Sequence, residues 1–249
     1  MPSQRYGVKL CAFESASWRY TGGSTSTVKT EKAPRSLKYV IQDVDQTGVL
    51  TFDLELVSDR PLNSYEVNVL HSWLFGKSGY RKLNIQAPDY SGFYFNCYMN
   101  SPEDYYIQDG FNGMKFNVVC DAPGAWEEPK IFSFKPADGS TIIINNTSAS
   151  NDYVYPIVEF TLSSGTEFAI TNMTDDENRP FSFSGLTSGE MCAVNGETGE
   201  ITSSLGLNRV GCFNKKFLRL LPGRNELKCA GSVSSLKIMY ANFVRLGAG

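Results

Sequence analysis

The sequence has a single histidine, no long apolar run and no excess of basic residues, and each of these absences excludes a class of protein. His71 is the one histidine among 249 residues, so a multi-histidine metal site is excluded and one imidazole remains for Ser-His or Cys-His catalysis. No stretch approaches the roughly 18 uncharged apolar residues of a membrane helix. The 23 Lys/Arg and 26 Asp/Glu give a net charge of −3, which disfavours a globally basic nucleic-acid binder.

The sequence start and the cysteines indicate a protein made in a reducing compartment. Residues 1–5 lack the apolar segment of a signal peptide, so we expect synthesis in a cytoplasm without membrane insertion. Six cysteines lie at positions 11, 97, 120, 192, 212 and 229. They form no Cys-x-x-Cys motif, so they fit neither a zinc site nor a thioredoxin-type redox pair. We expect six reduced thiols that act as small core hydrophobes, no metal and no cofactor.

The first half of the chain combines strands with one helix. Residues 50–56 and 114–118 alternate apolar and polar side chains, and residues 92–99 form an aromatic-rich strand candidate. A helix is predicted from Asn63 to Phe75, because Asn63 can cap it, Glu66 follows as in a capping box, and a glycine comes after its last turn. One helix packed on strands indicates an N-terminal α+β or β-sandwich-like domain.

The sequence pattern changes after residue 134, where turn residues and predicted short strands alternate. Strands are predicted at residues 141–144, 154–162, 167–171, 190–195, 199–203, 217–221, 225–229 and 235–240. Eight short strands in about 110 residues are typical of a β-sandwich. The sequence therefore predicts a mainly β protein of two domains, residues 1–133 and residues 134–249.

Charge is distributed unevenly along the chain. Residues 1–39 hold seven Lys/Arg and two Asp/Glu, and residues 40–133 hold six and thirteen. Residues 134–204 hold two and ten, and residues 205–249 hold eight and one. Either these segments interleave in the fold and mix their charges, or the basic first segment is an arm that lies across an acidic neighbour.

Candidate chemistry is sparse. Carboxylate pairs that could serve glycoside hydrolysis are Asp53 with Glu55 and Glu127 with Glu128. The acidic loop of Asp175, Asp176 and Glu177 could do the same or hold a calcium ion, but it lacks EF-hand spacing. His71 lies inside the predicted helix beside apolar residues, where a surface or packing role is the simpler interpretation.

Aromatic residues cluster in the predicted strand at 92–99 and just beyond it, where they could stack on sugars or bases. The cluster comprises Phe93, Tyr94, Phe95, Tyr98, Tyr105, Tyr106 and Phe111. Neighbouring strand residues face opposite ways, so at most half of them line one surface. A buried strand or a subunit contact is the simpler interpretation.

The order of several passages along nearly the whole chain resembles a known family. In the first half these are residues 45–49 (DQTGV), the strand at 50–57 with 58–60 (SDR), the helix, and residues 74–83 (LFGKSGYRKL). In the second half they are residues 189–196 (GEMCAVNG), 217–225 (FLRLLPGRN) and the closing strand at 236–240. Together they resemble the distal tail protein (Dit) family of bacteriophages with long, non-contractile tails. Asn195 stands where that family carries an aspartate.

The resemblance implies a structural, non-enzymatic protein of the virion, at the distal end of the tail. It implies a homo-hexameric adaptor ring between the tail tube protein and the tail-tip hub (tail-associated lysin) protein, with a channel that DNA crosses. A receptor-binding protein is a further partner in such tails. It also implies an N-terminal ring-forming belt domain at 1–133 and a galectin-like or carbohydrate-module (CBM)-like β-sandwich at 134–249.

Residues 1–39 are then expected to form an inter-subunit belt in which Arg5, Lys9, Arg19 and Lys29 contact acidic residues of the next subunit. Two alternatives remain open. One is a carbohydrate-binding, lectin-like protein of host recognition. This alternative is weakened because all three Trp lie at 18, 73 and 126, so the predicted C-terminal sandwich has no Trp on which a sugar could stack. The other is a β-sandwich glycosidase, for which no convincing carboxylate pair stands out.

Overall fold

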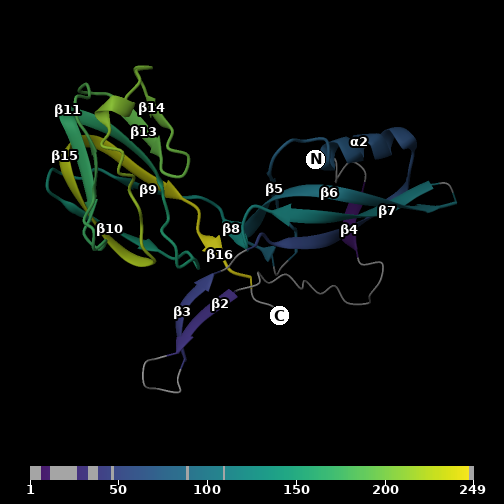
Figure 1. The fold of residues 1–249 in the computed structure, drawn as a ribbon. Coiled ribbons are helices and arrows are strands. Elements are labelled where there is room, and N and C mark those ends of the chain that lie inside the picture. The colour runs from purple at the N-terminus through teal and green to yellow at the C-terminus, as the bar shows by residue number, and fades with distance from the viewer. Residues whose placement is uncertain are drawn as a thin grey trace. The chain divides into compact units, whose positions relative to one another are not determined.

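The chain forms two compact units in a computed structural model, which describes residues 7–11, 27–32, 39–45, 48–87, 90–108 and 110–246. The first unit comprises residues 1–126 and 245–249, and the second comprises residues 127–244. The sequence places the boundary after residue 133, inside strand β9 (Lys130–Phe134), which as a whole belongs to the second unit. The fold is mainly β with a single α-helix among the described residues (Figure 1), so the predicted fold class is confirmed.

The main sheet of the first unit contains longer strands than the sequence predicts. Its strands run β1 (Val8–Cys11), β4 (Thr51–Leu62), β7 (Gly110–Cys120), β6 (Phe93–Ile107) and β8 (Ala125–Glu127), and β5 (Arg81–Leu83) pairs with β6. Along β7 every second side chain from Met114 to Cys120 is buried, as expected of a strand with one face on a core. The predicted strands at 50–56, 92–99 and 114–118 form parts of β4, β6 and β7.

Helix α2 (Ser64–Leu74) begins and ends where the sequence predicts. The Asn63 side chain accepts from the Glu66 N–H, and the Glu66 carboxylate accepts from the Asn63 N–H, which completes the capping box. Leu70 is fully buried, and the ring of Phe75, the C-cap residue, packs edge-on against Phe116 of β7 at 5.6 Å. The helix therefore covers the core face of this sheet.

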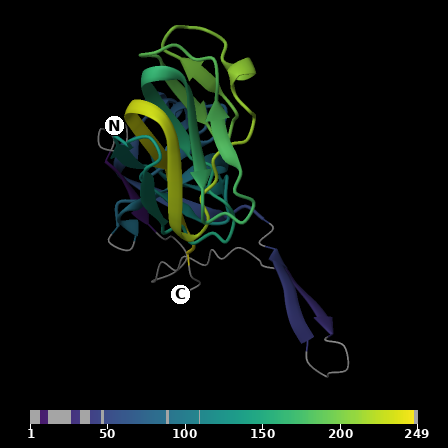
Figure 2. The same cartoon turned by 90° about the vertical axis from the view of Figure 1, so that its left-hand side faces the viewer.

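Strands β2 (Thr27–Lys32) and β3 (Tyr39–Asp45) form a separate antiparallel hairpin. Within the described part of the chain, the two strands pair with one another and with no other strand (Figures 1 and 2).

The second unit is built around two long strands rather than many short ones. β11 (Ile157–Asn172) replaces the two strands predicted at 154–162 and 167–171, and β15 (Gly223–Tyr240) replaces those predicted at 225–229 and 235–240. Residues 217–221, predicted as a strand, contribute a bridge between Leu220 and Val154. The remaining elements are β9, β10 (Thr141–Asn146), β12 (Pro180–Phe183), β13 (Met191–Asn195), β14 (Ile201–Ser203), the 3-10 helix η2 (Val210–Cys212) and β16 (Phe243–Val244).

The two long strands make the second unit a sandwich because both cross from one layer to the other. The first half of β11 pairs with β13 and with residues 235–239 of β15, and its second half pairs with β12 and with residues 227–230 of β15. Register shifts between Thr161 and Ala169 mark the corner. Gly231 has a φ of 95°, and a Cβ there would stand 2.5 Å from the Glu167 carbonyl oxygen, so the corner requires glycine.

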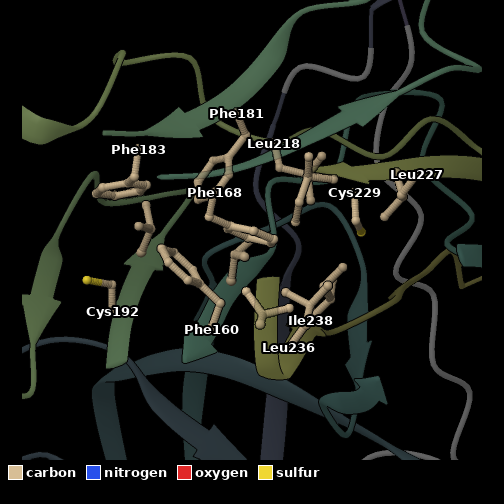
Figure 3. Close-up of a cluster of buried hydrophobic side chains, with 14 of the residues drawn as sticks. Phe160, Phe168, Phe181, Phe183, Cys192, Leu218, Leu227, Cys229, Leu236 and Ile238 are labelled. Atoms are coloured by element: carbon tan, nitrogen blue, oxygen red, sulfur yellow. The ribbon is translucent and has the colours of Figure 1, made fainter. Parts of the chain in front are cut away.

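The core of the second unit lies between these two layers. Phe160 and Phe168 come from opposite halves of β11, and their ring centroids lie 4.5 Å apart. Figure 3 shows them with Phe181, Leu236 and other buried side chains. Interdigitated aromatic rings of this kind supply much of a small sandwich's burial energy. The alternation in the sequence thus identifies the inward faces, although it misses the continuity of the strands.

The described cysteines are all free thiols. Four are buried, namely Cys97, Cys120, Cys192 and Cys229, and Cys11 and Cys212 are half-buried. Burial raises the pKa of Cys97, Cys120 and Cys192 to about 12. These thiols pack as small apolar side chains.

Candidate assembly surfaces

The single histidine has a packing role. His71 Nε2 lies 3.0 Å from Asp104 Oδ1, and the imidazole packs edge-on against Phe75 at 5.4 Å. The contact with Asp104 joins helix α2 to strand β6. His71 is therefore a half-buried residue of the helix surface, as the sequence indicates.

The carboxylates considered for catalysis are held by neighbouring side chains. Asp53 Oδ1 accepts from Asn117 Nδ2 at 3.0 Å, and Lys115 Nζ lies 3.5 Å from Asp53 Oδ2. Glu127 accepts from Asn242 Nδ2 at 2.8 Å and pairs with Lys130 at 2.7 Å. Hydrogen bonds from Lys130 and Asn242 lower the pKa of Glu127. These contacts connect strands, which is a structural use of the charges.

The acidic loop considered for calcium holds an arginine instead. Arg219 donates from Nε to Asp175 Oδ2 at 2.6 Å and from Nη2 to Asp175 Oδ1 at 2.7 Å. Its Nη2 also lies 2.9 Å from Glu177, and its guanidinium stacks on Tyr153 at 4.1 Å. The Arg219 hydrogen bonds lower the pKa of Asp175. Within the described ranges, no group of three or more His, Cys, Asp or Glu is placed to hold a metal ion.

A second ion pair, between Glu190 and Arg209, is also not predicted by the sequence. Glu190 is 1% exposed, and its carboxylate accepts from Arg209 Nε at 2.8 Å and Nη2 at 2.7 Å. Ser203 Oγ and the Thr187 N–H also donate to it, at 2.6 and 2.9 Å. These donors, Arg209 foremost, lower the pKa of Glu190 to about 2. A glutamate at the start of a predicted strand gives no signal that its partner lies 19 residues ahead.

The Glu190–Arg209 pair fixes a loop that carries exposed apolar side chains. Leu205 and Leu207 are each 51% exposed and Val210 is 47% exposed. Hydrogen bonds from backbone to side chain order the loop, because the Leu205 N–H donates to Ser203 Oγ and the Val210 N–H donates to Asn208 Oδ1. An ordered loop that presents several large aliphatic side chains is typical of a protein–protein contact.

The β2–β3 hairpin is the second candidate surface. A two-stranded hairpin on its own is marginally stable in water, because it lacks a sheet or helix on which to bury a face. No third strand among the described residues pairs with either of its edges, and backbone groups at a sheet edge can pair with a further strand. Both properties favour a hairpin that is completed by another chain.

The four predicted belt residues fall in different places. Lys9 lies on β1 and pairs with Asp59 of its own chain at 2.8 Å, with both side chains exposed. Lys29 lies on β2, opposite Asp43 in the hairpin register. Arg5 and Arg19 lie outside the described residues.

The charged segments of the second half of the chain interleave, which is one of the two arrangements considered from the sequence. Arg209 and Arg219 come from the basic segment at 205–249, and they pair with Glu190 and Asp175 of the acidic segment at 134–204. Lys237 of β15 pairs likewise with Glu159 of β11 at 2.7 Å. Part of the charge asymmetry of this half is therefore neutralised within one unit.

Every helix that the structure describes is too short or too polar to cross a bilayer.

Comparisons with family models identify both halves of the chain as domains of phage tail proteins. A family model described as a phage tail protein N-terminal domain matches residues 1–122, and one described as a phage tail C-terminal domain matches residues 125–240. A search of curated proteins found no match.

Two solved structures with a similar fold are phage proteins. One is the Dit protein (gp 19.1) of SPP1, described as a paradigm of the hub adsorption apparatus in phages that infect Gram-positive bacteria. It aligns over 96% of this chain and 94% of its own, with a TM-score of 0.66 and 11% identity. A chain of the phage p2 baseplate in its activated conformation aligns over 95% and 92%, with a TM-score of 0.53 and 11% identity. The mainly β fold expected from the resemblance to distal tail proteins is confirmed.

Proposed function

The chain belongs to a family of phage tail proteins, and on that basis we propose that it is the distal tail protein of its virion. In this proposal six copies form an adaptor ring between the tail tube protein and the tail-tip hub protein, and DNA passes through the central channel. The second unit is a galectin-like sandwich on the outside of the ring, where a receptor-binding protein can attach. No catalytic step is assigned to the chain.

The observation that carries the proposal is the unpaired hairpin. β2 and β3 pair with no other strand of the described chain, and a lone hairpin gains stability when a neighbour covers it or extends it. In a ring each subunit can supply that neighbour, because head-to-tail contacts join one face to a different face around the circle. The full-length likeness in fold to a hub protein supports the same arrangement.

The basic segment at 1–39 supports the belt role. It carries seven Lys/Arg and two Asp/Glu, and the following segment at 40–133 carries six and thirteen. We propose that Arg5, Lys9, Arg19 and Lys29 lie against acidic residues of the next subunit, and that Lys9 exchanges its exposed pair with Asp59 for that contact. Complementary charge steers such contacts and fixes their register.

The test is the solution mass of the full chain by light scattering, with negative-stain images of the same peak. We expect a ring of about 166 kDa, six times the 27.6 kDa of one chain. A variant in which a short Gly-Ser linker replaces residues 27–45 should be monomeric. A wild-type chain that stays monomeric, or a hairpin-deleted chain that still forms the ring, would contradict the proposal.

The belt contacts are tested by charge reversal with a matched control. Replacing Arg5, Lys9, Arg19 and Lys29 with Glu should abolish the ring. The same replacement of Lys77, Lys135, Lys215 and Lys216, which are exposed and lie outside the segment, should leave it intact. Equal loss in both variants would show that net charge, and not the belt, controls assembly.

A further inference from the structure

Cys97 and Cys120 lie directly opposite one another on the antiparallel strands β6 and β7. The Asp121 N–H donates to the Asn96 carbonyl at 2.9 Å, so the neighbouring pair Asn96 and Asp121 is the hydrogen-bonded one. Cys97 and Cys120 therefore occupy a non-hydrogen-bonded position, where Cα atoms are about 4.5 Å apart. That spacing lies within the range of about 4.4 to 6.8 Å found in disulfides.

Both thiols project from the same, buried face of the sheet. Cys97 is 1% exposed and Cys120 is not exposed. Desolvation raises the pKa of each thiol to about 12, and the charge of Cys97 contributes to the increase at Cys120. The two thiols thus lie at opposed positions on one buried face, and the native fold keeps them protonated and slow to react.

The other cysteines on described strands lack a cysteine partner in the strand register, and Cys212 lies on the 3-10 helix η2 and not on a strand. Cys11 is opposite Glu55 on β4, Cys192 is flanked by Phe160 and Ser203, and Cys229 is opposite Ile170. The opposed pair is therefore a local feature of β6 and β7 and not a consequence of cysteine content.

We propose that Cys97 and Cys120 form a cross-strand disulfide when the protein meets an oxidising medium. With a small-molecule disulfide as oxidant, one thiolate attacks it, releases one small thiol and forms a mixed disulfide. The second cysteine thiolate then displaces the other small thiol. Two S–H bonds and the oxidant's S–S bond are replaced by one protein S–S bond and two small-molecule thiols, which carry away the two electrons and two protons.

The setting of a tail protein makes this chemistry relevant. Such a protein is made in a reducing cytoplasm and then serves in a particle outside the cell, where disulfides persist. The bond would join β6, the longest strand of the first unit's main sheet, to its neighbour β7, near the ends remote from their connecting turn. The proposal does not depend on the ring.

The experiment maps the bond in the full wild-type chain. The reduced protein is incubated with excess oxidised glutathione in a low concentration of urea, which allows β6 and β7 to open transiently, and is then alkylated and digested with trypsin. Cleavage after Lys82, Lys115 and Lys130 places Cys97 alone in peptide 83–115 and Cys120 alone in peptide 116–130. We expect these two peptides joined, at a mass two hydrogens below their sum, with four alkylated cysteines remaining of the six.

Two variants serve as controls. Cys97→Ser should give no joined peptide, whereas Cys229→Ser, which removes an equally buried cysteine, should still give it. The oxidised wild type should unfold several degrees higher than the reduced form, because the bond restricts the unfolded chain. Glutathione attached separately to both cysteines, or Cys97 and Cys120 both fully alkylated after oxidation, would overturn the proposal.

Discussion

The buried pair of Glu190 and Arg209 makes a sharp prediction about the stability of the second unit. Replacing Glu190 with Gln keeps the shape but turns one acceptor oxygen into an NH2 donor, so the bidentate pair is broken and the partly buried Arg209 guanidinium loses its counter-charge. Breaking a buried pair in this way costs about 3 to 5 kcal/mol. The shift in the pKa of Glu190, which has the same Arg209 hydrogen bonds as its main cause, has a similar magnitude. The fall from an ordinary 4.5 to about 2 corresponds to about 3 kcal/mol.

The same numbers fix the sign of the pH dependence. Because the pKa of Glu190 is lower in the folded chain, its contribution is fully present above pH 4.5 and is lost as the pH falls from about 4.5 towards 2. In E190Q this part of the acid sensitivity should be absent. The stability difference between wild type and variant should therefore shrink as the pH falls through that range.

The assay must report on the second unit alone. All three tryptophans lie outside residues 127–244, so pulsed hydrogen exchange in urea, read from peptides of 127–244, is the suitable measurement. With a slope of about 1.5 kcal/mol per molar urea, the midpoint of E190Q should fall by about 2 M at pH 7. The control is Glu226→Gln, in the exposed pair with Arg224, which should shift it little. Equal midpoints for E190Q and wild type would refute the reasoning.

Three other substitutions test the local arguments. Asn63→Ala removes the cap shared with Glu66 and should cost about 1 kcal/mol, measured by urea unfolding of the first unit through its Trp fluorescence; no change would mean that the capping box does not stabilise α2. Gly231→Ala should prevent stable folding of the corner beside Glu167, seen as weak hydrogen-exchange protection in β11 and β15, and native protection would contradict the steric argument. Phe160→Ala should destabilise the second unit by about 3 to 5 kcal/mol, measured by pulsed exchange, and a loss under 1 kcal/mol would mean that the core closes around the space.

The sequence by itself determined the mainly β class, the helix and the inward faces of the strands. These follow from local rules, because alternation, capping residues and glycine positions act within a few residues. The helix from Ser64 to Leu74 and its capping box are the clearest case. The resemblance to distal tail proteins likewise came from the order of short passages and gave the fold correctly.

The tertiary structure alone decided what the charges and the long strands do. Arg209 and Arg219 reach acidic partners 19 and 44 residues away, and no local pattern encodes a pairing that depends on how β-layers stack. The tertiary structure also decided that β11 and β15 each continue through a corner, where the sequence pattern predicts two separate strands. The opposition of Cys97 and Cys120 is likewise a matter of strand register, which is set by the contacts of whole strands and not by the spacing of two cysteines.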